Sequence, residues 1–295
     1  MDLKNFIKRP LFTVTGKLSG IINNFHNKLA RKYAEQEFEK KEKLWNDLFQ
    51  GKNFFEFTLK NKAKINLYKD SILSKYIYEG FEEDETNYAV SILKDGDIFI
   101  DVGANIGLFT LFASEVVGEE GKVICFEPSP STFLRLSENV NLNEFKNIDL
   151  RNIGLSDKKE ELIFYVSENG NDAYNSFAPS QDDKLEKSIK VPVSTLDFEL
   201  NDVDKSSIKL IKIDVEGWEK FVLNGGVDFL KNYNPIVMVE FTEENTFNAG
   251  YPVLEIFDIM QKFGYSWYRI IEGELVLEKK KMSYPYVNLI AVKNN

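Results

Sequence analysis

Apolar and polar positions follow two different patterns along the chain. Residues 28–50 carry apolar side chains at roughly helical spacing, and Glu–Lys pairs four residues apart support a helix there. Two short apolar runs, 54–59 and 64–68, are separated by a polar turn and predict a strand pair. From residue 98 onward, short apolar runs suited to buried strands alternate with helical segments. This order predicts an α/β fold with a mainly parallel, doubly wound sheet.

The elements of this α/β region can be placed from the same pattern. The expected strands are Ile98–Val102, Lys122–Phe126, Ile148–Ile153, Ile208–Ile213, Pro235–Phe241, Ser266–Ile271 and Val287–Val292. The expected helices are residues 85–93, Gly107–Val117, Pro130–Asn141 and Pro252–Lys262. Leu162–Val166 fits a hairpin partner strand. The polar segment 167–188 is expected to be a long loop, and such loops often form lids or binding surfaces.

Composition places the chain among globular proteins. It has 295 residues, of which 43% are hydrophobic and 28% charged, so it can bury a sizeable core. Its single cysteine, Cys125, excludes an internal disulfide, and its single histidine, His26, argues against a Ser-His-Asp triad or a His-rich metal site. No apolar run approaches about 18 residues and no signal peptide is recognisable, so we expect a cytoplasmic protein without a transmembrane segment.

Charge is distributed unevenly. The net charge is −10, yet residues 1–64 carry 14 Lys and Arg against 7 Asp and Glu. The acidic remainder is a poor nucleic-acid binder because phosphate contacts dominate such affinity, so no nucleic acid is expected as a partner. The basic segment is either a solvated helix face or a surface for self-association or for an anionic partner. We expect an N-terminal helical extension, residues 1–64, that includes the start of the strand pair, followed by a main domain, residues 65–295.

The strongest chemical signal is the segment Ile100–Gly107, which ends an expected strand and opens a helix. Gly103 lets the chain turn tightly or approach a ligand closely, and we expect free amide groups at the start of the helix to face the crevice above the strand ends. Asp101 would repel a pyrophosphate but attract a sulfonium, so the loop favours S-adenosylmethionine over a nicotinamide dinucleotide. Glu127, at the end of the next strand, can accept both hydroxyls of a ribose. The alternative, a tight turn without a ligand, requires these features to coincide by accident.

A second acidic motif, Asp214-Val215-Glu216-Gly217, follows the strand expected at Ile208–Ile213. If the backbone stays extended, Asp214 and Glu216 lie on one side, and paired carboxylates tend to raise one pKa, which suits a proton acceptor for a hydroxyl. The pair can instead hold a divalent cation with Glu240, although nothing in the sequence requires a metal. A simpler alternative is that one of the two carboxylates caps the helix that starts near Trp218.

Several segments, in this order, resemble the FkbM family of methyltransferases. They are Ile100–Gly107, Phe126–Pro128, Leu155–Asp157, Lys212–Gly217 and Val222–Gly225. The resemblance covers about residues 78–270 and has no counterpart for residues 1–64. It implies a class I, Rossmann-like fold of seven strands with the last one antiparallel, and S-adenosylmethionine as cofactor. Asn105 replaces the middle glycine of the wider G-x-G-x-G pattern, as is usual in this family.

The resemblance also implies roles for individual residues. The methionine part of the cofactor would be held by Asp101, Gly103, Ala104, Asn105 and Gly107, and the ribose by Glu127. Ser156 and Asp157 would flank the adenine. Asp214 and Glu216 would border the methyl-transfer site.

Relatives of this family methylate hydroxyls of polyketides, sugars and other glycans, so an O-methyltransferase acting on a sugar, a glycan or another small natural product is expected. A catalytically silent module that docks through its basic N-terminal arm is the alternative. A nicotinamide oxidoreductase is a third reading, which the acid ahead of the glycine loop disfavours.

Overall fold

The structure is a computed structural model that describes residues 28, 32–33, 36–167, 172–179 and 186–294. The chain divides into two compact units, the first ending at Asn53 and the second comprising Phe54–Asn295. Within the first unit, residues 36–48 are helical, inside the range expected for a helix. His26 lies outside the described residues. The strand pair expected near residue 60 belongs entirely to the second unit.

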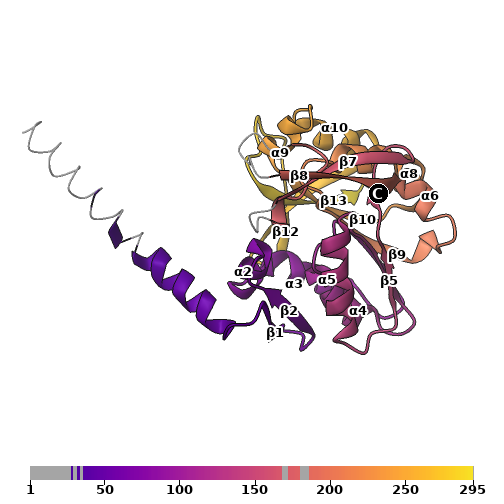
Figure 1. Ribbon diagram of the computed structural model, residues 1–295. Helices are drawn as coiled ribbons and strands as arrows, with labels where there is room; N and C mark the ends of the chain where they lie inside the picture. Colours follow the sequence, from indigo (N-terminus) through magenta and orange to yellow (C-terminus); the bar gives the residue numbers. More distant parts are fainter. Residues whose placement is uncertain (1–27, 29–31, 34–35, 168–171, 180–185, 295) are drawn as a thin grey trace, which may run out of the picture. The chain divides into compact units, whose positions relative to one another are not determined.

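The second unit is built around a sheet of eight strands in the order β12-β11-β13-β10-β9-β3-β4-β5 (Figure 1). Their bounds are β3 Ile98–Val102, β4 Lys122–Phe126, β5 Ile148–Arg151, β9 Ile208–Ile213, β10 Ile236–Phe241, β11 Tyr265–Ile271, β12 Glu274–Leu277 and β13 Val287–Lys293. The strands from β5 to β10 are parallel neighbours, whereas β13 runs antiparallel to both β10 and β11. The predicted seven-stranded, doubly wound sheet with an antiparallel last strand is therefore confirmed. The edge strand β12 is an addition to it.

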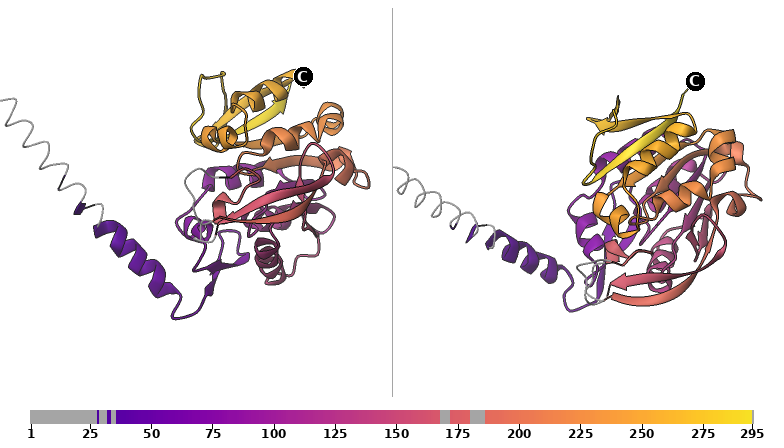
Figure 2. Two further views of the ribbon diagram at one scale, coloured as in Figure 1. Left: turned by 45° about the horizontal axis from the view of Figure 1, so that its top comes forward. Right: turned by 90° about the horizontal axis from the view of Figure 1, so that it is seen from above.

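Helices cover both faces of this sheet (Figures 1 and 2). The strand order grows outward in two directions from the β3–β9 pair. Right-handed crossovers therefore place the helices that follow β3 and β4 on one face, and the helices between β9 and β10 on the opposite face. The helices are α2 Ile72–Tyr78, α3 Glu83–Ile92, α4 Leu108–Val117, α5 Pro130–Asn141, α6 Leu196–Glu199, α7 Glu219–Asn224, α8 Val227–Tyr233, α9 Glu243–Asn248 and α10 Leu254–Lys262. Because both faces are covered, β3 is buried at all five positions, which explains its continuous apolar run.

Two smaller sheets complete the second unit. β1 Phe54–Thr58 and β2 Lys64–Tyr68 form the predicted antiparallel pair. β6 Gly154–Leu155, β7 Glu160–Ser167 and β8 Glu186–Ser194 form a three-stranded sheet. The expected hairpin strand lies within β7, but its partner β8 begins inside the segment expected to be a loop. The described part of that segment also contains the short 3₁₀ helix η2, Asp172–Tyr174, and a second one, η3, spans Lys205–Ser207.

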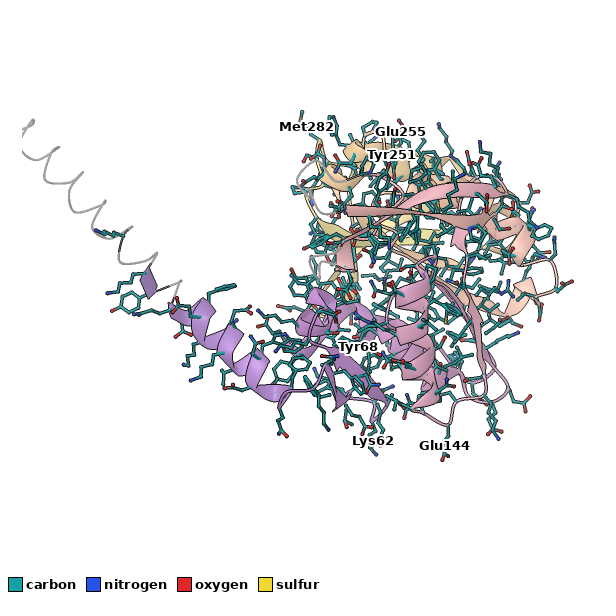
Figure 3. All side chains as sticks on the ribbon, in the orientation of Figure 1. Lys62, Tyr68, Glu144, Tyr251, Glu255 and Met282 are labelled. Atoms are coloured by element: carbon teal, nitrogen blue, oxygen red, sulfur yellow. The ribbon has the colours of Figure 1, made fainter. Side chains whose placement is uncertain are left out.

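Side chains fill the space between the sheet and its helices, while Met282 and Glu144 lie on the outside (Figure 3). Several of the largest buried side chains lie where β10, β11 and α10 meet, and the rings of Trp267 and Phe257 there are 5.8 Å apart. Among the described residues, no helix combines the length and apolar composition needed to cross a bilayer.

The position of β13 inside the sheet makes its side chains critical for stability. Leu289 of β13 is fully buried, whereas Leu277 of the edge strand β12 is 56% exposed. We expect Leu289→Ala to lower the free energy of unfolding by about 2–5 kcal/mol because it leaves a cavity in the core. Leu277→Ala, the matched control, should change it by at most about 0.5 kcal/mol. Urea denaturation of both variants checks this, and equal losses would contradict the assignment of β13 to the sheet interior.

Candidate active site

The carboxyl ends of the central parallel strands border a cavity of about 440 Å³. Its lining includes the predicted site residues Asp101, Gly103, Ala104, Asn105, Glu127, Asp214 and Glu216. Gly107, Ser156 and Asp157, which were also predicted, lie outside the lining. Side chains from distant segments close the cavity, among them Leu73 and Tyr76 of α2 and Tyr286 just before β13. The lining therefore comes from segments near the start and near the end of the second unit's sequence.

The loop after β3 uses its amides internally. The amides of Gly103 and Ala104 both donate to the carbonyl of Phe126, at 3.0 and 3.1 Å, and the amide of Gly107 donates to the carbonyl of Ala104 at 2.9 Å. The amide of Asn105 donates to a carboxylate. These four loop amides are therefore not available to a ligand. The free amides expected at the start of the following helix are a separate set, because α4 begins at Leu108. A pyrophosphate would find none of these donors available, which is a further argument against a dinucleotide.

Gly103 brings the first motif against the second. Its φ is +83°, and a Cβ there would lie 1.8 Å from the carbonyl oxygen of Asp214. The amide of Asp214 in turn donates to the carbonyl of Val102 at 3.0 Å. Only glycine allows this close approach, so the loop after β3 and the acidic motif after β9 form one continuous edge of the cavity.

Glu127 is a buried carboxylate held by two amides. Its oxygens accept hydrogen bonds from the amides of Asn105, at 3.0 Å, and Ser129, at 2.9 Å. Burial nevertheless raises the pKa of Glu127 to about 7. Each carboxylate oxygen has a further lone pair, so the group is fixed in orientation and still able to accept hydroxyl donors from the cavity.

Ser156 and Asp157 lie beside the cavity, behind its lining. The buried hydroxyl of Ser156 accepts the indole N–H of Trp218 at 3.2 Å and donates to Asp157 at 3.4 Å. The preceding residues, Gly154 and Leu155, are the ones that line the cavity. This turn therefore presents its backbone and Leu155 to the cavity, while Ser156 orients Trp218.

The second acidic motif does not cap the helix that follows it. α7 begins after Trp218, and Glu219 accepts the amides of Val215 and Gly217, at 3.2 and 3.0 Å. The alternative in which Asp214 or Glu216 serves as the cap is therefore wrong. Both carboxylates are left to face the cavity.

A buried lysine lies in the middle of this acidic edge. The ammonium of Lys212 donates to Oδ2 of Asp214 at 2.6 Å and lies 4.8 Å from the ring centre of Phe109. Burial disfavours the charged form, but the carboxylates of Asp214, Glu82 and Asp101 outweigh it and raise the pKa of Lys212. Lys212 was not predicted as a site residue, although a charged residue in the apolar strand β9 was a usable signal.

Asp214, Glu216 and Glu240 form a compact group of carboxylates, each with one oxygen within 4.8 Å of the others. The condition of an extended backbone between the first two is not met, because Glu216 has a left-handed φ of +53° and lies in a turn. Burial, and then the charge of neighbouring carboxylates, raises the pKa of both Glu216 and Glu240 well above the usual range. A raised pKa makes the ionised carboxylate a stronger base.

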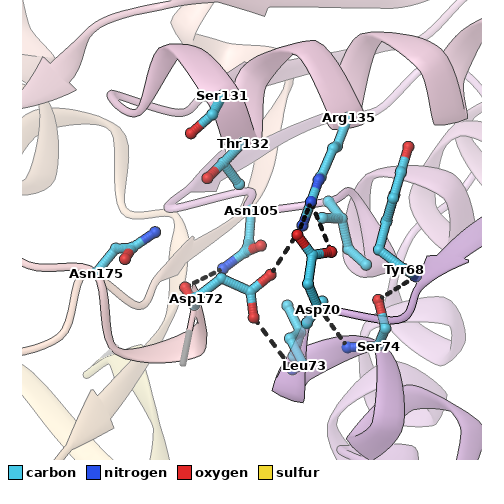
Figure 4. Close-up of polar contacts among 12 residues, drawn as sticks. Tyr68, Asp70, Leu73, Ser74, Asn105, Ser131, Thr132, Arg135, Asp172 and Asn175 are labelled. Atoms are coloured by element: carbon cyan, nitrogen blue, oxygen red, sulfur yellow. Dashed lines mark hydrogen bonds and ion pairs between the residues drawn. The ribbon is translucent and has the colours of Figure 1, made fainter. Parts of the chain in front are cut away.

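A polar network fixes the wall of the cavity that α2 and η2 form (Figure 4). Arg135 of α5 donates to both oxygens of Asp70 at 2.8 Å and lies 3.7 Å from a carboxylate oxygen of Asp172. The other oxygen of Asp172 accepts the amide of Leu73 at 3.5 Å. The side-chain amide of Asn105 donates to the carbonyl of Asp172 at 3.2 Å. Asn105 therefore connects the loop after β3 to η2.

Comparison with known proteins is consistent with this arrangement. A family model described as the methyltransferase FkbM domain matches residues 101–267. The 2-O-methyltransferase NoeI of Sinorhizobium fredii is 24% identical over 208 residues, which are 65% of this chain and 84% of NoeI. The hexuronic acid methyltransferase AglP of Haloferax volcanii is 29% identical over 161 residues, 53% of this chain and 61% of AglP. Methyltransferase 1 of Beauveria bassiana is 29% identical, and the chain spans 61% of its length, again less than two thirds.

Solved structures of methyltransferases also match parts of this chain. The FkbM methyltransferase from Methylobacillus flagellatus has a TM-score of 0.42 and 13% identity over 70% of this chain and 50% of its own. An S-adenosylmethionine-dependent O-methyltransferase from Thermotoga maritima has a TM-score of 0.41 and 12% identity over 84% and 80%.

The matched segment begins at Asp101 in β3 and ends at Trp267 in β11, so it contains the glycine loop, Glu127 and both acidic residues after β9. It also covers more than half of the chain. This chain belongs to the FkbM family of S-adenosylmethionine-dependent methyltransferases.

Proposed function

We propose that the protein transfers a methyl group from S-adenosylmethionine to a hydroxyl of a sugar, a glycan or another small natural product. The observation that carries this proposal is the group of Asp214, Glu216 and Glu240 in a cavity whose lining also includes Glu127. The relatives NoeI and AglP, by their names a 2-O-methyltransferase and a hexuronic acid methyltransferase, support a sugar acceptor.

The residues present fit the cofactor. Asp101 is 1% exposed, and its Oδ1 has no hydrogen-bond partner among the described residues although the residue lines the cavity. An ammonium donor from the methionine part would satisfy this oxygen, and Glu127 would accept the ribose hydroxyls. Bound S-adenosylmethionine supplies an electrophilic methyl group on a positively charged sulfur. The acidic edge around Asp214 favours such a cation by its charge.

The acidic motif supplies the acceptor for the hydroxyl proton. Either Asp214 or Glu216 takes this proton as the methyl group is transferred, and the raised pKa of Glu216 suits that task. Most of the rate would come from holding the hydroxyl and the cofactor together in line. Lys212 positions Asp214, and the side chain of Asn245 positions Glu216 through a hydrogen bond of 2.5 Å.

A second, polar hollow of about 290 Å³ lies next to Glu216 and is where we propose that the acceptor binds. Tyr174, Ser176, Asn245 and Asn248 contribute to its lining. Tyr174 is 51% exposed and lines both hollows, so its ring can pack on one face of a sugar while hydroxyls and amides bind the ring's substituents.

The role of residues 1–64 remains a prediction, since half of this segment lies outside the described residues. The silent docking module would act through this segment. The cytoplasmic location and the absence of a nucleic-acid partner also stay predictions from the sequence.

Removing the carboxylate of Glu127 should weaken cofactor binding. Loss of a charged acceptor for the ribose costs about 1.5–3 kcal/mol, which corresponds to roughly ten- to over a hundredfold in affinity. Calorimetric titration of wild type and Glu127→Ala with S-adenosylhomocysteine measures this. Glu127→Gln, which keeps the shape of the side chain and one acceptor oxygen, controls for loosening of the loop and should lose less. Equal affinity in all three proteins would remove Glu127 from the cofactor site.

Removing the carboxylate of either candidate base should leave cofactor binding nearly unchanged but lower the rate of methyl transfer. Asp214→Asn and Glu216→Gln should bind S-adenosylhomocysteine within about threefold of wild type. At least one of them should lose about 10²–10⁴-fold in methyl transfer, the usual contribution of a general base. Transfer of a labelled methyl group to a panel of mono- and oligosaccharides provides the measurement. Full activity in both variants would contradict the proposal that Asp214 or Glu216 accepts the proton.

A further inference from the structure

We propose that Asp214, Glu216 and Glu240 bind a hard divalent cation, of the Mg²⁺, Mn²⁺ and Ca²⁺ class, at the carboxyl ends of β9 and β10. The first observation is the spacing of their oxygens, all within 4.8 Å of one another. Oxygens on opposite sides of an ion lie about 4 Å apart around Mg²⁺ and up to about 5 Å apart around Ca²⁺. One ion can therefore contact all three side chains.

The second observation is a buried, unsatisfied oxygen on one of the three carboxylates. Glu240 is only 6% exposed, and its Oε2 has no hydrogen-bond partner among the described residues. Buried carboxylate oxygens are almost always paired because desolvation without a partner is costly. Glu240 lines the same cavity as Asp214 and Glu216 but comes from the next strand. A cation between the three carboxylates would satisfy it.

The contacts around the group leave one oxygen of each carboxylate open. Lys212 occupies Oδ2 of Asp214, and the side-chain amide of Asn245 occupies Oε2 of Glu216. The remaining oxygens, Oδ1 of Asp214 and Oε1 of Glu216, have no hydrogen bond in the described part of the chain. Partners that hold one oxygen and release the other are the usual way in which proteins orient metal-binding carboxylates.

The charge of the cavity also favours a divalent ion. Four further carboxyl side chains line it, namely Glu82, Asp101, Glu127 and Glu244. Among the described lining residues, Lys212 is the one ammonium set against this total. No histidine or cysteine is present in the described lining, and an all-oxygen set selects hard cations over zinc or copper.

The consequence of such an ion for catalysis rests on the proposed function, whereas its binding does not. A hydroxyl that approaches the ion becomes more acidic because the cation stabilises the alkoxide. Asp214 and Glu216 would then act by holding the ion as well as by accepting a proton.

Manganese alone, added to the full chain without cofactor or acceptor, tests the site by electron paramagnetic resonance. We expect wild type to bind one Mn²⁺ per chain, and Mg²⁺ or Ca²⁺ to displace it. Glu240→Gln should weaken Mn²⁺ binding roughly tenfold or more. Glu244→Gln removes the same charge from the same cavity outside the group of three, and it should change the affinity by about twofold or less.

Failure of wild type to bind Mn²⁺ at millimolar concentration would overturn the proposal. Equal weakening in Glu240→Gln and Glu244→Gln would also overturn it, because general attraction by the acidic cavity would then be sufficient. If Glu240→Gln fails to fold, as judged by circular dichroism, Glu216→Gln replaces it with the same expected loss. Cofactor binding without Mn²⁺ binding would refute this inference alone, and Mn²⁺ binding without methyl transfer would refute the proposed function alone.

Discussion

The negative charge buried at the carboxyl edge of the sheet is the constraint on which the surrounding residues depend. A carboxylate withdrawn from water is costly unless a positive charge or a donor compensates it. Lys212 provides that compensation from inside β9, within the reach of Asp214, Glu82 and Asp101. It also lies on the ring of Phe109, which helps to hold the ammonium in place. The surplus of carboxylates over this lysine is what makes the cavity receptive to cations.

Hydrogen bonds of the surrounding backbone hold these charged groups in fixed positions. The amides of the loop after β3 are committed to β4, and Gly103 lies directly against the carbonyl of Asp214. The carboxylate of Glu127 is held by two further amides. The groups that face the cavity therefore keep their positions before any ligand arrives, so that little reorganisation is needed during reaction.

The sequence was sufficient to predict the elements whose signals are local. β3, β4 and β9 match their predicted bounds because they are short apolar runs covered on both faces, and α5 does so because Ser129 caps it and Pro130 occupies its first turn. β8 was missed, since it contains Pro192, a residue that argues against a strand in the sequence, and several polar residues.

The position of Glu82 in the site could not be predicted either. It depends on contacts with segments far away in the chain, such as the hydrogen bond from Asn288. The hydrogen bonds of the amides in the glycine loop could not be predicted either. A motif gives the residues of a turn but not the acceptors that lie opposite them.

The position of β13 has a consequence for how the chain folds during synthesis. Residues 287–293 pair with β10 on one side and β11 on the other, although β11 and β12 precede them in the chain. Until the ribosome has released these residues, the nascent sheet stops at β10, with a row of open backbone groups on that edge. The β11–β12 hairpin then has no neighbour to join. Completion of the sheet therefore waits for β13, and until then the edge of β10 is a point at which a nascent chain needs protection from other strands.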